Sequence, residues 1–221
     1  MQYKEAERLM NVEEQKLMED FSRLLQVAQG AMTVTEKPVE AHYCGYLVQK
    51  NPLDLWIYHE ILWECRPDLI IECGTASGGT TLFLAHQLDW IGDGFIASID
   101  IANRLEEVPK HPRIWNLVSD SLSPELMYDI GTLTVNGTPL SKLKVMVILD
   151  DDHSTDHVLQ ELEFYGTVVT PGQYLIVEDT NVDGPRSAVE KFLQTHDEFV
   201  QDRTREKFLM TWNPGGYLKR L

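Results

Sequence analysis

Two runs of acidic residues have the composition of a metal site. Residues 150–153 read Asp-Asp-Asp-His, and residues 178–179 read Glu-Asp. Each run closes a nearly all-apolar stretch, residues 144–150 and 173–179, that we predict to be a buried strand. Neighbouring parallel strands lie about 5 Å apart, so we expect both runs to meet at one edge of a sheet. Adjacent carboxylates repel one another unless a cation or water screens them, and their oxygens suit a hard divalent cation such as Mg²⁺.

A structural interpretation accounts for part of the first run. Ser154 can cap a helix that continues to about residue 165, which would explain some of the preceding acids without a metal. His153 stands next to the predicted ligands and is a candidate general base. A histidine at the start of a helix is as often a structural contact, so both interpretations stay open here.

A second feature is the glycine-rich stretch at residues 69–81, which reads Leu-Ile-Ile-Glu-Cys-Gly-Thr-Ala-Ser-Gly-Gly-Thr-Thr. Three consecutive aliphatic residues predict a strand buried on both faces, as in a parallel sheet. Apolar residues at helical spacing predict a helix over residues 80–90. A strand, a glycine-rich turn and a helix place bare backbone and a helix N-terminus beside the carboxyl edge of the sheet, where α/β proteins bind ligands.

The spacing of this turn matches neither G-x-G-x-x-G nor a phosphate loop, because no lysine follows. With an acid two residues before the first glycine, it resembles motif I of the class I S-adenosylmethionine (SAM) methyltransferases. In that family the turn passes under the methionine part of the cofactor, and the acid helps to hold its amino group. The resemblance implies cofactor contacts by Glu72, Gly74, Thr75, Ser77, Gly78 and Gly79. Taken alone, the glycines are equally compatible with a purely conformational role.

Two further predicted strands end in polar residues that suit a nucleoside. The strand over residues 94–101 ends at Asp100, whose carboxylate can accept two hydrogen bonds from a ribose diol. The strand over residues 113–119 is followed by Asp120 and Ser121. In methyltransferases that resemble this layout, such a polar pair contacts the adenine. Asp120 or Ser121 can also cap a helix that starts near Pro124, and the two roles are compatible.

The overall composition favours a globular protein with a small-molecule partner. The chain has 221 residues, 43% of them hydrophobic, and a formal net charge of −16. This charge opposes binding to nucleic acid or to an anionic membrane surface. We see no secretory signal and no segment long enough to span a bilayer. The three cysteines lack metal-site spacing, so we expect a reducing, cytoplasmic setting.

The remaining segments complete the expected architecture. Residues 3–28 have apolar positions at helical steps, and this helix could cap the active site, join a second subunit or pack on its own domain. Residues 29–44 suggest a connecting loop or lid, and Asn51-Pro52 begins a helix to residue 65 whose aromatic residues we expect in the core. Residues 199–207 and 209–212, followed by Asn213-Pro-Gly-Gly and Tyr217-Leu218, suggest an antiparallel pair at the sheet edge and then a turn. We therefore predict an N-terminal segment over residues 1–48, a domain over residues 49–221 and a homo-oligomer.

Five separate motifs resemble one family more closely than class I as a whole. They are Lys50-Asn-Pro-Leu-Asp-Leu-Trp, Ile71-Glu-x-Gly-Thr-Ala-x-Gly-Gly, Leu149-Asp-x-Asp-His-Ser, Val177-Glu-Asp-Thr-Asn-Val and Asn213-Pro-Gly-Gly-Tyr-Leu-Lys-Arg. The resemblance, which extends from residue 50 to the C-terminus, is to the cephalosporin hydroxylase family, which also contains rhamnosyl O-methyltransferases. It implies a Rossmann-like SAM-binding domain and a Mg²⁺ site made by a strand-end aspartate and a later Glu-Asp pair.

Transferred to this chain, the family's metal site implies Glu178 and Asp179 as one pair of ligands. The remaining ligand is Asp152 or Asp150. Asp152 belongs to the Asp-His-Ser part of the motif and is our first choice, whereas the catechol-type metal-dependent methyltransferases would suggest Asp150. We expect Asp150, Asp152 and His153 to form the catalytic group. Cys73 stands where the family pattern has threonine, which matters little if the backbone makes the contact.

Together these observations predict an α/β, Rossmann-like class I methyltransferase fold: a mostly parallel seven-stranded sheet with helices on both faces and an N-terminal helical extension. The predicted reaction is SAM- and Mg²⁺-dependent methyl transfer to a hydroxyl of a small molecule, a natural product or sugar, in secondary metabolism. Acceptors other than sugars, including phenols and an amine, stay open. The rival hypotheses are an oxidoreductase or hydroxylase with a carboxylate and histidine metal site, and a non-catalytic SAM-binding scaffold.

Overall fold

The computed structural model describes residues 13–14, 16–17, 20–21, 41–103, 105–208 and 210–221. Within the predicted N-terminal helix, the described residues 13–14, 16–17 and 20–21 are helical. The rest of that helix, and most of the predicted loop or lid, lie outside the described residues. In the part of the chain that is described, no helix is both long and apolar enough to cross a membrane.

The described chain is built on a seven-stranded sheet with the strand order β10-β11-β9-β8-β3-β4-β5. Its strands are β3 (Leu69–Cys73), β4 (Phe95–Asp100), β5 (Ile114–Val118), β8 (Val145–Leu149), β9 (Tyr174–Val177), β10 (Phe199–Gln201) and β11 (Tyr217–Arg220). The pairs β3·β4, β4·β5, β3·β8 and β8·β9 are parallel, and β11 is antiparallel to both of its neighbours. The predicted fold class is confirmed.

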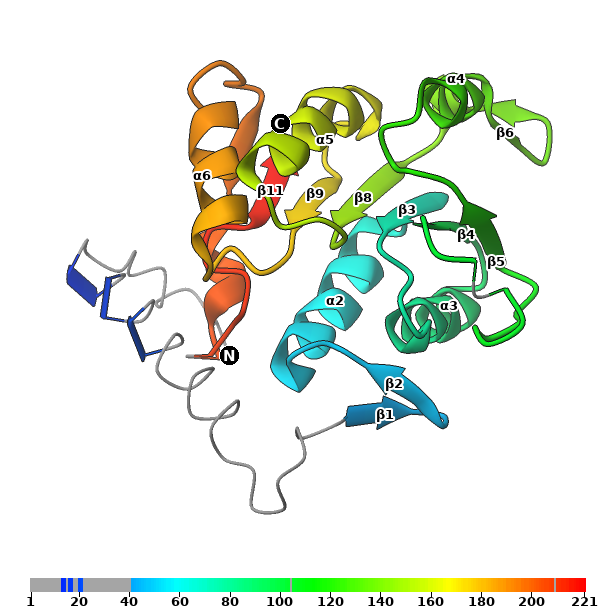
Figure 1. Cartoon of the computed structure of the whole chain (residues 1–221), viewed down its shortest axis with the longest axis horizontal. Helices are drawn as coiled ribbons and strands as arrows, with labels where there is room; N and C mark the ends of the chain where they lie inside the picture. Colours follow the sequence, from blue (N-terminus) through cyan, green and yellow to red (C-terminus); the bar gives the residue numbers. More distant parts are fainter. Residues whose placement is uncertain (1–12, 15, 18–19, 22–40, 104, 209) are drawn as a thin grey trace, which may run out of the picture.

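Helices cover both faces of this sheet (Figure 1). One face packs against α2 (Pro52–Cys65) and α3 (Gly79–Ile91), and the other against α4 (Pro124–Thr132), α5 (Thr155–Val168) and α6 (Asp183–Phe192). Alternation along β3 produces the two cores, since Leu69 and Ile71 belong to the α5 side and Ile70 to the α2 side. The β3 strand is therefore buried on both faces, as its aliphatic run predicts.

Local capping signals set the helix starts. The Asn51 side chain accepts a hydrogen bond from the Leu53 N–H, with Pro52 at the first helical position, as expected. The cap of α4 differs from the prediction: Ser123, rather than Asp120 or Ser121, accepts a hydrogen bond from the Leu126 N–H. Asp120 instead accepts from the Leu122 N–H within its own turn, which is a local alternative to capping.

Three other predictions need correction. Trp56 and Trp63 are more than half exposed, because the buried face of α2 carries Ile57, Tyr58, Ile61 and Leu62 while the two tryptophans lie one heptad apart on another face. Within the expected loop over residues 29–44, β1 (Ala41–Tyr43) forms a hairpin with β2 (Tyr46–Val48), which lies beside α3 (Figure 1). The edge partner of β10 is β11, after the Pro214 turn, because residues 203–206 form a 3₁₀ turn, η2 (Arg203–Glu206).

Some elements of the described fold were not predicted from the sequence. These are α6, the 3₁₀ turn η1 (Leu140–Lys142) and the hairpin of β6 (Thr134–Val135) and β7 (Thr138–Pro139) around Asn136-Gly137. An Asn-Gly turn between two short strands favours such a hairpin, because both central residues adopt a positive φ.

Candidate active site

A cleft runs along the carboxyl ends of the parallel strands. Its larger part encloses about 560 Å³ and is lined by residues from the ends of β3, β4, β5 and β8, including Gly74, Asp100, Ser121 and Asp150. A smaller part of about 250 Å³ adjoins it, and Gly74 and Asp150 line both. The larger volume lies within the range of about 300–1,000 Å³ that is usual for small-molecule sites. Predicted cofactor and metal residues therefore share one rim.

The glycine turn is shaped by close backbone contacts. Gly74 has φ +97°, and a Cβ placed there would lie 2.0 Å from the Asp150 carbonyl oxygen. A Cβ on Gly79 would lie 2.3 Å from the Leu47 carbonyl oxygen of β2. Any other residue at either position would push these segments apart. Gly74 consequently joins the end of β3 to the end of β8, which is the contact that brings the turn and the first acidic run together.

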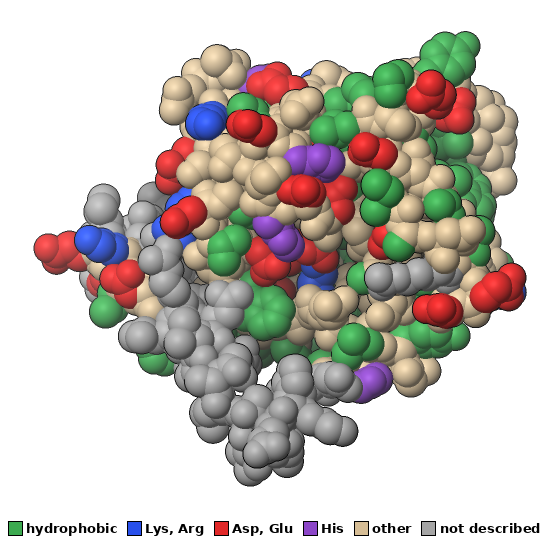
Figure 2. All heavy atoms as spheres, in the orientation of Figure 1, with side chains coloured by type: hydrophobic (Ala, Val, Ile, Leu, Met, Phe, Trp, Pro, Cys, Tyr) green, Lys and Arg blue, Asp and Glu red, His purple; other side chains and the backbone are tan. Residues whose placement is uncertain are grey.

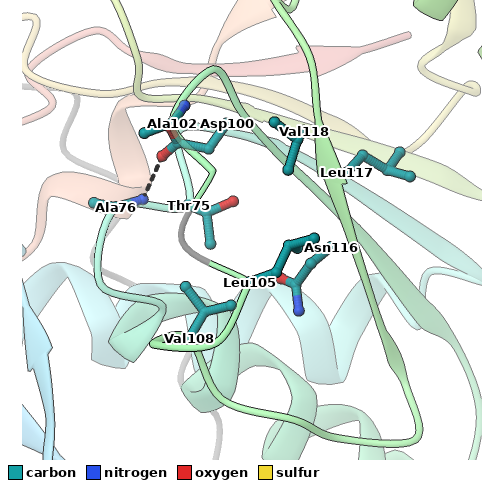
Figure 3. Close-up of a pocket in the computed structure, with 9 residues that line it drawn as sticks. All are labelled: Thr75, Ala76, Asp100, Ala102, Leu105, Val108, Asn116, Leu117 and Val118. Carbon is teal, nitrogen blue, oxygen red and sulfur yellow. Dashed lines mark hydrogen bonds between the residues drawn. The ribbon is translucent and has the colours of Figure 1, made fainter.

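Asp100 lies at the end of β4 with its carboxylate tied to the backbone. Its two oxygens accept hydrogen bonds from the Ala76 N–H at 2.8 Å and the Ala102 N–H at 2.7 Å. Figure 3 shows Asp100, Thr75 and Asn116 among the residues that line a narrow pocket beside the turn, with the Asp100 carboxylate hydrogen-bonded to the Ala76 N–H. The pocket has room for about one water molecule, so the larger cleft is the place for a ligand.

The structure does not place every predicted cofactor residue in the cleft. Thr75, Ser77 and Gly79 line the smaller part, and Asp120 and Ser121 line the larger part. Gly78 packs against Pro109. Glu72 is 2% exposed, and its Oε2 accepts hydrogen bonds from the hydroxyls of Thr81 at 2.5 Å and Ser98 at 2.7 Å. Burial raises the pKa of Glu72 to about 7, and the carboxyl lies behind the turn.

Three of the predicted acidic and basic groups come together at the rim; we call Asp150, His153 and Asp179 the first cluster. Each offers one ligand atom, and these atoms lie within 4.8 Å of one another. His153 Nε2 is 3.4 Å from Asp179 Oδ2 and 3.8 Å from Asp150 Oδ1. Burial and the nearby Asp150 carboxylate raise the pKa of Asp179, and its buried Oδ1 has no hydrogen-bond partner among the described residues. A buried carboxylate oxygen without a hydrogen bond is well suited to act as a ligand for a cation.

Local backbone geometry aims Asp179 at the rim. The residue has φ +53°, in the left-handed region, and its N–H donates to Asn213 Oδ1 at 2.9 Å. A non-glycine residue in this region is strained and needs support from its surroundings. Asn213 belongs to the Asn-Pro-Gly-Gly motif. The loop that carries this motif therefore supports Asp179, which follows the end of β9.

Glu178 lies below the rim and is paired with Lys50. The side chain of Lys50 is buried, and its Nζ donates to Asp150 Oδ2 and lies 3.2 Å from Glu178 Oε1. The Tyr58 hydroxyl also donates to Glu178 Oε1. Burial raises the pKa of Glu178 to about 7, although Lys50 opposes this. Although burial disfavours its charge, Asp150 and Glu178 hold the pKa of Lys50 above its usual value.

Asp152 does not join the first cluster. Its side chain is exposed, and Oδ1 accepts a hydrogen bond from the Ser154 N–H at 2.7 Å at the start of α5. Hydrogen bonding to Ser154, through its side chain first and then its N–H, lowers the pKa of Asp152. Asp152 therefore lies in the turn before α5 and lines the larger part of the cleft, while Asp150 lines both parts.

Figure 2 shows acidic and histidine side chains gathered in the middle of one face of the molecule, with a basic side chain among them. Sequence reasoning missed several contributors: Lys50, Tyr58, Gln49, Ala76 and His157. Lys50 opens one of the five motifs, which was a signal that it has a role. Ala76 lies within the glycine turn of a second motif, and Tyr58, Gln49 and His157 depend on the way α2, the β2 end and α5 pack around the rim.

Comparison with known proteins agrees with this geometry. The family model for rhamnosyl O-methyltransferase/CmcI matches residues 36–221. Rhamnosyl O-methyltransferase of Mycobacterium leprae is 34% identical over 192 residues, covering 80% of this chain and 82% of the relative. The protein of the same name from Mycobacterium tuberculosis H37Rv is 33% identical over 196 residues, covering 80% and 77%.

Solved structures of CmcI have the same fold. An apo form superposes with a TM-score of 0.62 at 20% identity, over 82% of this chain and 76% of that chain. A form with magnesium and SAM also superposes with a TM-score of 0.62, at 18% identity, over 88% and 84%. These likenesses concern the arrangement of helices and strands.

The parallel sheet, the motif I turn and the cleft at the strand ends define a class I SAM-dependent methyltransferase. Within that class, the chain belongs to the rhamnosyl O-methyltransferase/CmcI family. The predicted family and the prediction that this chain is a SAM-dependent O-methyltransferase are confirmed.

Proposed function

We propose that this enzyme transfers the methyl group of SAM to a hydroxyl of a small molecule with the help of Mg²⁺. The observation that carries the proposal is the contact between Gly74 and the Asp150 carbonyl, with both residues lining both parts of the cleft. This contact supports a cofactor and a cation bound at adjacent places. The magnesium and SAM held by the CmcI structure fit the same proposal.

Asp150 and Asp179 are the proposed metal ligands. Mg²⁺ prefers oxygen atoms and keeps several waters, so two carboxylates from neighbouring strand ends suffice. Asp150 Oδ2 is occupied by Lys50, which leaves Oδ1 towards the cleft, and Asp179 Oδ1 lacks a hydrogen bond within the described chain. Glu178 is paired with Lys50 and Tyr58, and Lys50 also binds Asp150, so Glu178 has a supporting role. Asp152, which accepts from the Ser154 N–H, is not among the proposed ligands.

His153 is the proposed proton acceptor. Its side chain is 41% exposed and its Nε2 faces Asp150 and Asp179, so it can receive the proton of an acceptor hydroxyl placed over the first cluster. When bound, SAM supplies an electrophilic methyl group and Mg²⁺ supplies a Lewis acid that makes a nearby hydroxyl more acidic. The chain's part is to align donor and acceptor, with Asp100 and Ser121 on the nucleoside side.

A sugar hydroxyl is the first acceptor class to test, because the relatives matched over four fifths of this chain are named rhamnosyl O-methyltransferases. The polar lining of the cleft, with the Asp150 carboxylate on one side, suits a hydroxyl-rich molecule. A natural product carrying such a sugar belongs to the same proposal. Assembly into a homo-oligomer, a cytoplasmic location and a lid function of the N-terminal segment stay predictions.

Asp150→Asn and Asp152→Asn form a matched pair for testing the metal assignment. We expect Asp150→Asn to lower Mg²⁺-dependent methyl transfer to rhamnosides about 100-fold or more, as loss of a group that stabilises the reacting charge commonly does. Asp152→Asn should stay within about threefold of the wild type, because its carboxylate lies outside the first cluster and accepts a hydrogen bond from the Ser154 N–H. The measurement is the formation of S-adenosylhomocysteine with Mg²⁺ and with a chelator. Equal losses in the two variants, or full activity in chelator, would contradict the proposal.

A further inference from the structure

A second group of metal-ligating side chains lies on the other side of Asp150; we call Asp151, His157 and Glu161 the second cluster. Each offers one ligand atom, all within 4.8 Å of one another. The proposed methyl transfer uses none of the three. Asp151 follows β8, while His157 and Glu161 are four residues apart on α5 and so share one helix face.

Glu161 is the feature that points to a ligand. Its side chain has no exposed surface, and neither carboxylate oxygen has a hydrogen-bond partner in the described chain. The nearest cationic group is His157, whose Nε2 lies 3.7 Å from Oε1. A buried carboxylate without hydrogen bonds is costly, and burial raises the pKa of Glu161 to about 7. Both oxygens are therefore candidate ligands for a cation held next to His157.

The spacing of the second cluster fits a first-row divalent ion. His157 Nε2 lies 3.4 Å from Asp151 Oδ2 and 3.7 Å from Glu161 Oε1. Ligand atoms at about 2.0–2.2 Å from Zn²⁺ in a tetrahedron are separated by roughly 3.3–3.6 Å. Ser121 Oγ lies 2.8 Å from Asp151 Oδ2 and 3.1 Å from His157 Nε2, so it borders the second cluster on one side. His157 Nε2 lies between the two carboxylates of the second cluster, and an imidazole ligand in that position favours a transition-metal ion. At the first cluster the imidazole of His153 is instead the proposed proton acceptor, which leaves only carboxylate ligands for Mg²⁺.

The competing explanation is a protonated His157 that serves both acids. The Glu161 carboxylate has the largest effect on the pKa of His157 and, together with Asp151, raises it to about 9. Burial opposes this shift. A single imidazolium nitrogen 3.4 and 3.7 Å from the two carboxylates leaves Glu161 Oε2 without a partner among the described residues. An ion in the same position would reach both acids.

We propose that Asp151, His157 and Glu161 bind a divalent transition-metal ion of the Zn²⁺ type, in a structural site separate from the Mg²⁺ site of the first cluster. The ion would tie the Ser121 turn after β5 and the Asp151 turn after β8 to helix α5. Both turns line the larger part of the cleft. Its occupation would therefore stiffen one wall of the cofactor site without taking part in methyl transfer.

The test is titration of the full-length chain with Zn²⁺ in saturating Mg²⁺, followed by calorimetry. We expect one Zn²⁺ per chain in the wild type and in Asp179→Asn, which alters only the first cluster. Glu161→Gln and His157→Gln should each weaken Zn²⁺ binding at least about tenfold. The matched control is His196→Gln, since His196 also faces a carboxylate, Glu163 at 3.5 Å, but on the surface of the molecule.

Crystals of the wild-type chain soaked in Zn²⁺ provide a measurement that needs no variant. An anomalous peak bounded by Asp151, His157 and Glu161 supports the proposal. A peak only at Asp150 and Asp179, an absence of Zn²⁺ binding in Mg²⁺, or unchanged affinity in folded Glu161→Gln overturns it and leaves the protonated His157 as the explanation. Circular dichroism of each variant identifies those that fold.

Discussion

The first and second clusters contain the same residue types, but different partners neutralise their carboxylates. Each has two carboxylates and one histidine. At the first cluster, Asp150 and the nearby Glu178 share the buried ammonium of Lys50, and the Tyr58 hydroxyl donates to Glu178. At the second cluster the described structure places no lysine or arginine in contact with Asp151 or Glu161, and Glu161 is left without a hydrogen bond.

This difference separates two ways of stabilising buried acids. The Lys50 ammonium neutralises Asp150 Oδ2 and Glu178 Oε1. Asp150 Oδ1 and Asp179 can then bind an exchangeable ligand at the rim. The second cluster depends on one imidazole, so an external ion adds more to it. The predictions below test that contrast in order of decreasing effect on the free energy of unfolding.

Lys50→Met is expected to have the largest effect on stability. It removes the partner of two acids and leaves Glu178 buried without its cation, which should lower the free energy of unfolding by about 3–5 kcal/mol. Urea unfolding in chelator measures the loss. Adding Glu178→Gln to the variant should restore part of it. A loss below about 1 kcal/mol would mean that Lys50 is not the counter-ion of the first cluster.

Tyr58→Phe and Tyr165→Phe compare one hydrogen bond at each cluster. The Tyr58 hydroxyl donates to the Glu178 carboxylate, and the Tyr165 hydroxyl donates to the Ser121 carbonyl at 2.8 Å beside the second cluster. Hydrogen bonds to charged groups contribute about 1.5–3 kcal/mol, and neutral ones about 0.5–1.5 kcal/mol. We therefore expect the larger loss for Tyr58→Phe in chemical denaturation. The reverse order would contradict a charged Glu178.

Asp202 provides a reference outside both clusters, with the smallest expected effect. Its carboxylate accepts from the Tyr174 hydroxyl at 2.5 Å and from Arg205 Nε at 3.1 Å. Burial works to raise its pKa, but hydrogen bonds from Thr204 and Tyr174 and the Arg205 charge hold the pKa of Asp202 below its usual value. This lowered pKa contributes stability above the usual carboxyl pKa of about 3.9, and the contribution is lost as the pH falls through the folded value.

Asp202→Asn should consequently cost about 1 kcal/mol near neutral pH and less below about pH 4. Thermal unfolding across this range measures the difference. Glu178 and Asp179, whose pKa values are raised, have the opposite dependence, because a raised carboxyl pKa contributes stability that is lost as pH rises. A penalty for Asp202→Asn that grew on acidification would remove the contrast between this pair and the clusters.

The sequence predicted more of the sheet than of the site. Buried parallel strands are visible as apolar runs, and their acidic or glycine-rich ends identify the carboxyl edge before any coordinates. The N-cap at Asn51 and the turn at Gly74 follow from single residues with strong local preferences. Motif likeness placed the chain in its family and class.

Side-chain partners could not be predicted in this way. Asp150 and Asp152 are both acids near one strand end. They differ because the Asp150 N–H still donates to the Cys73 carbonyl of β3, while Asp152 lies in the turn before α5 and accepts from the Ser154 N–H. The exposed Trp56 and Trp63 show the same limit, since helical spacing alone does not say which face packs on the sheet.

By itself, the sequence determined the α/β architecture, the glycine turn and the family, because these depend on local periodicity, backbone preference and residue identity. Only the tertiary structure decided that Lys50, 100 residues before Asp150, neutralises the first cluster, and that Asp151, His157 and Glu161 form a second. The physical reason is that electrostatic partnership depends on distance and burial in space, which packing of α2 and α5 against the sheet establishes.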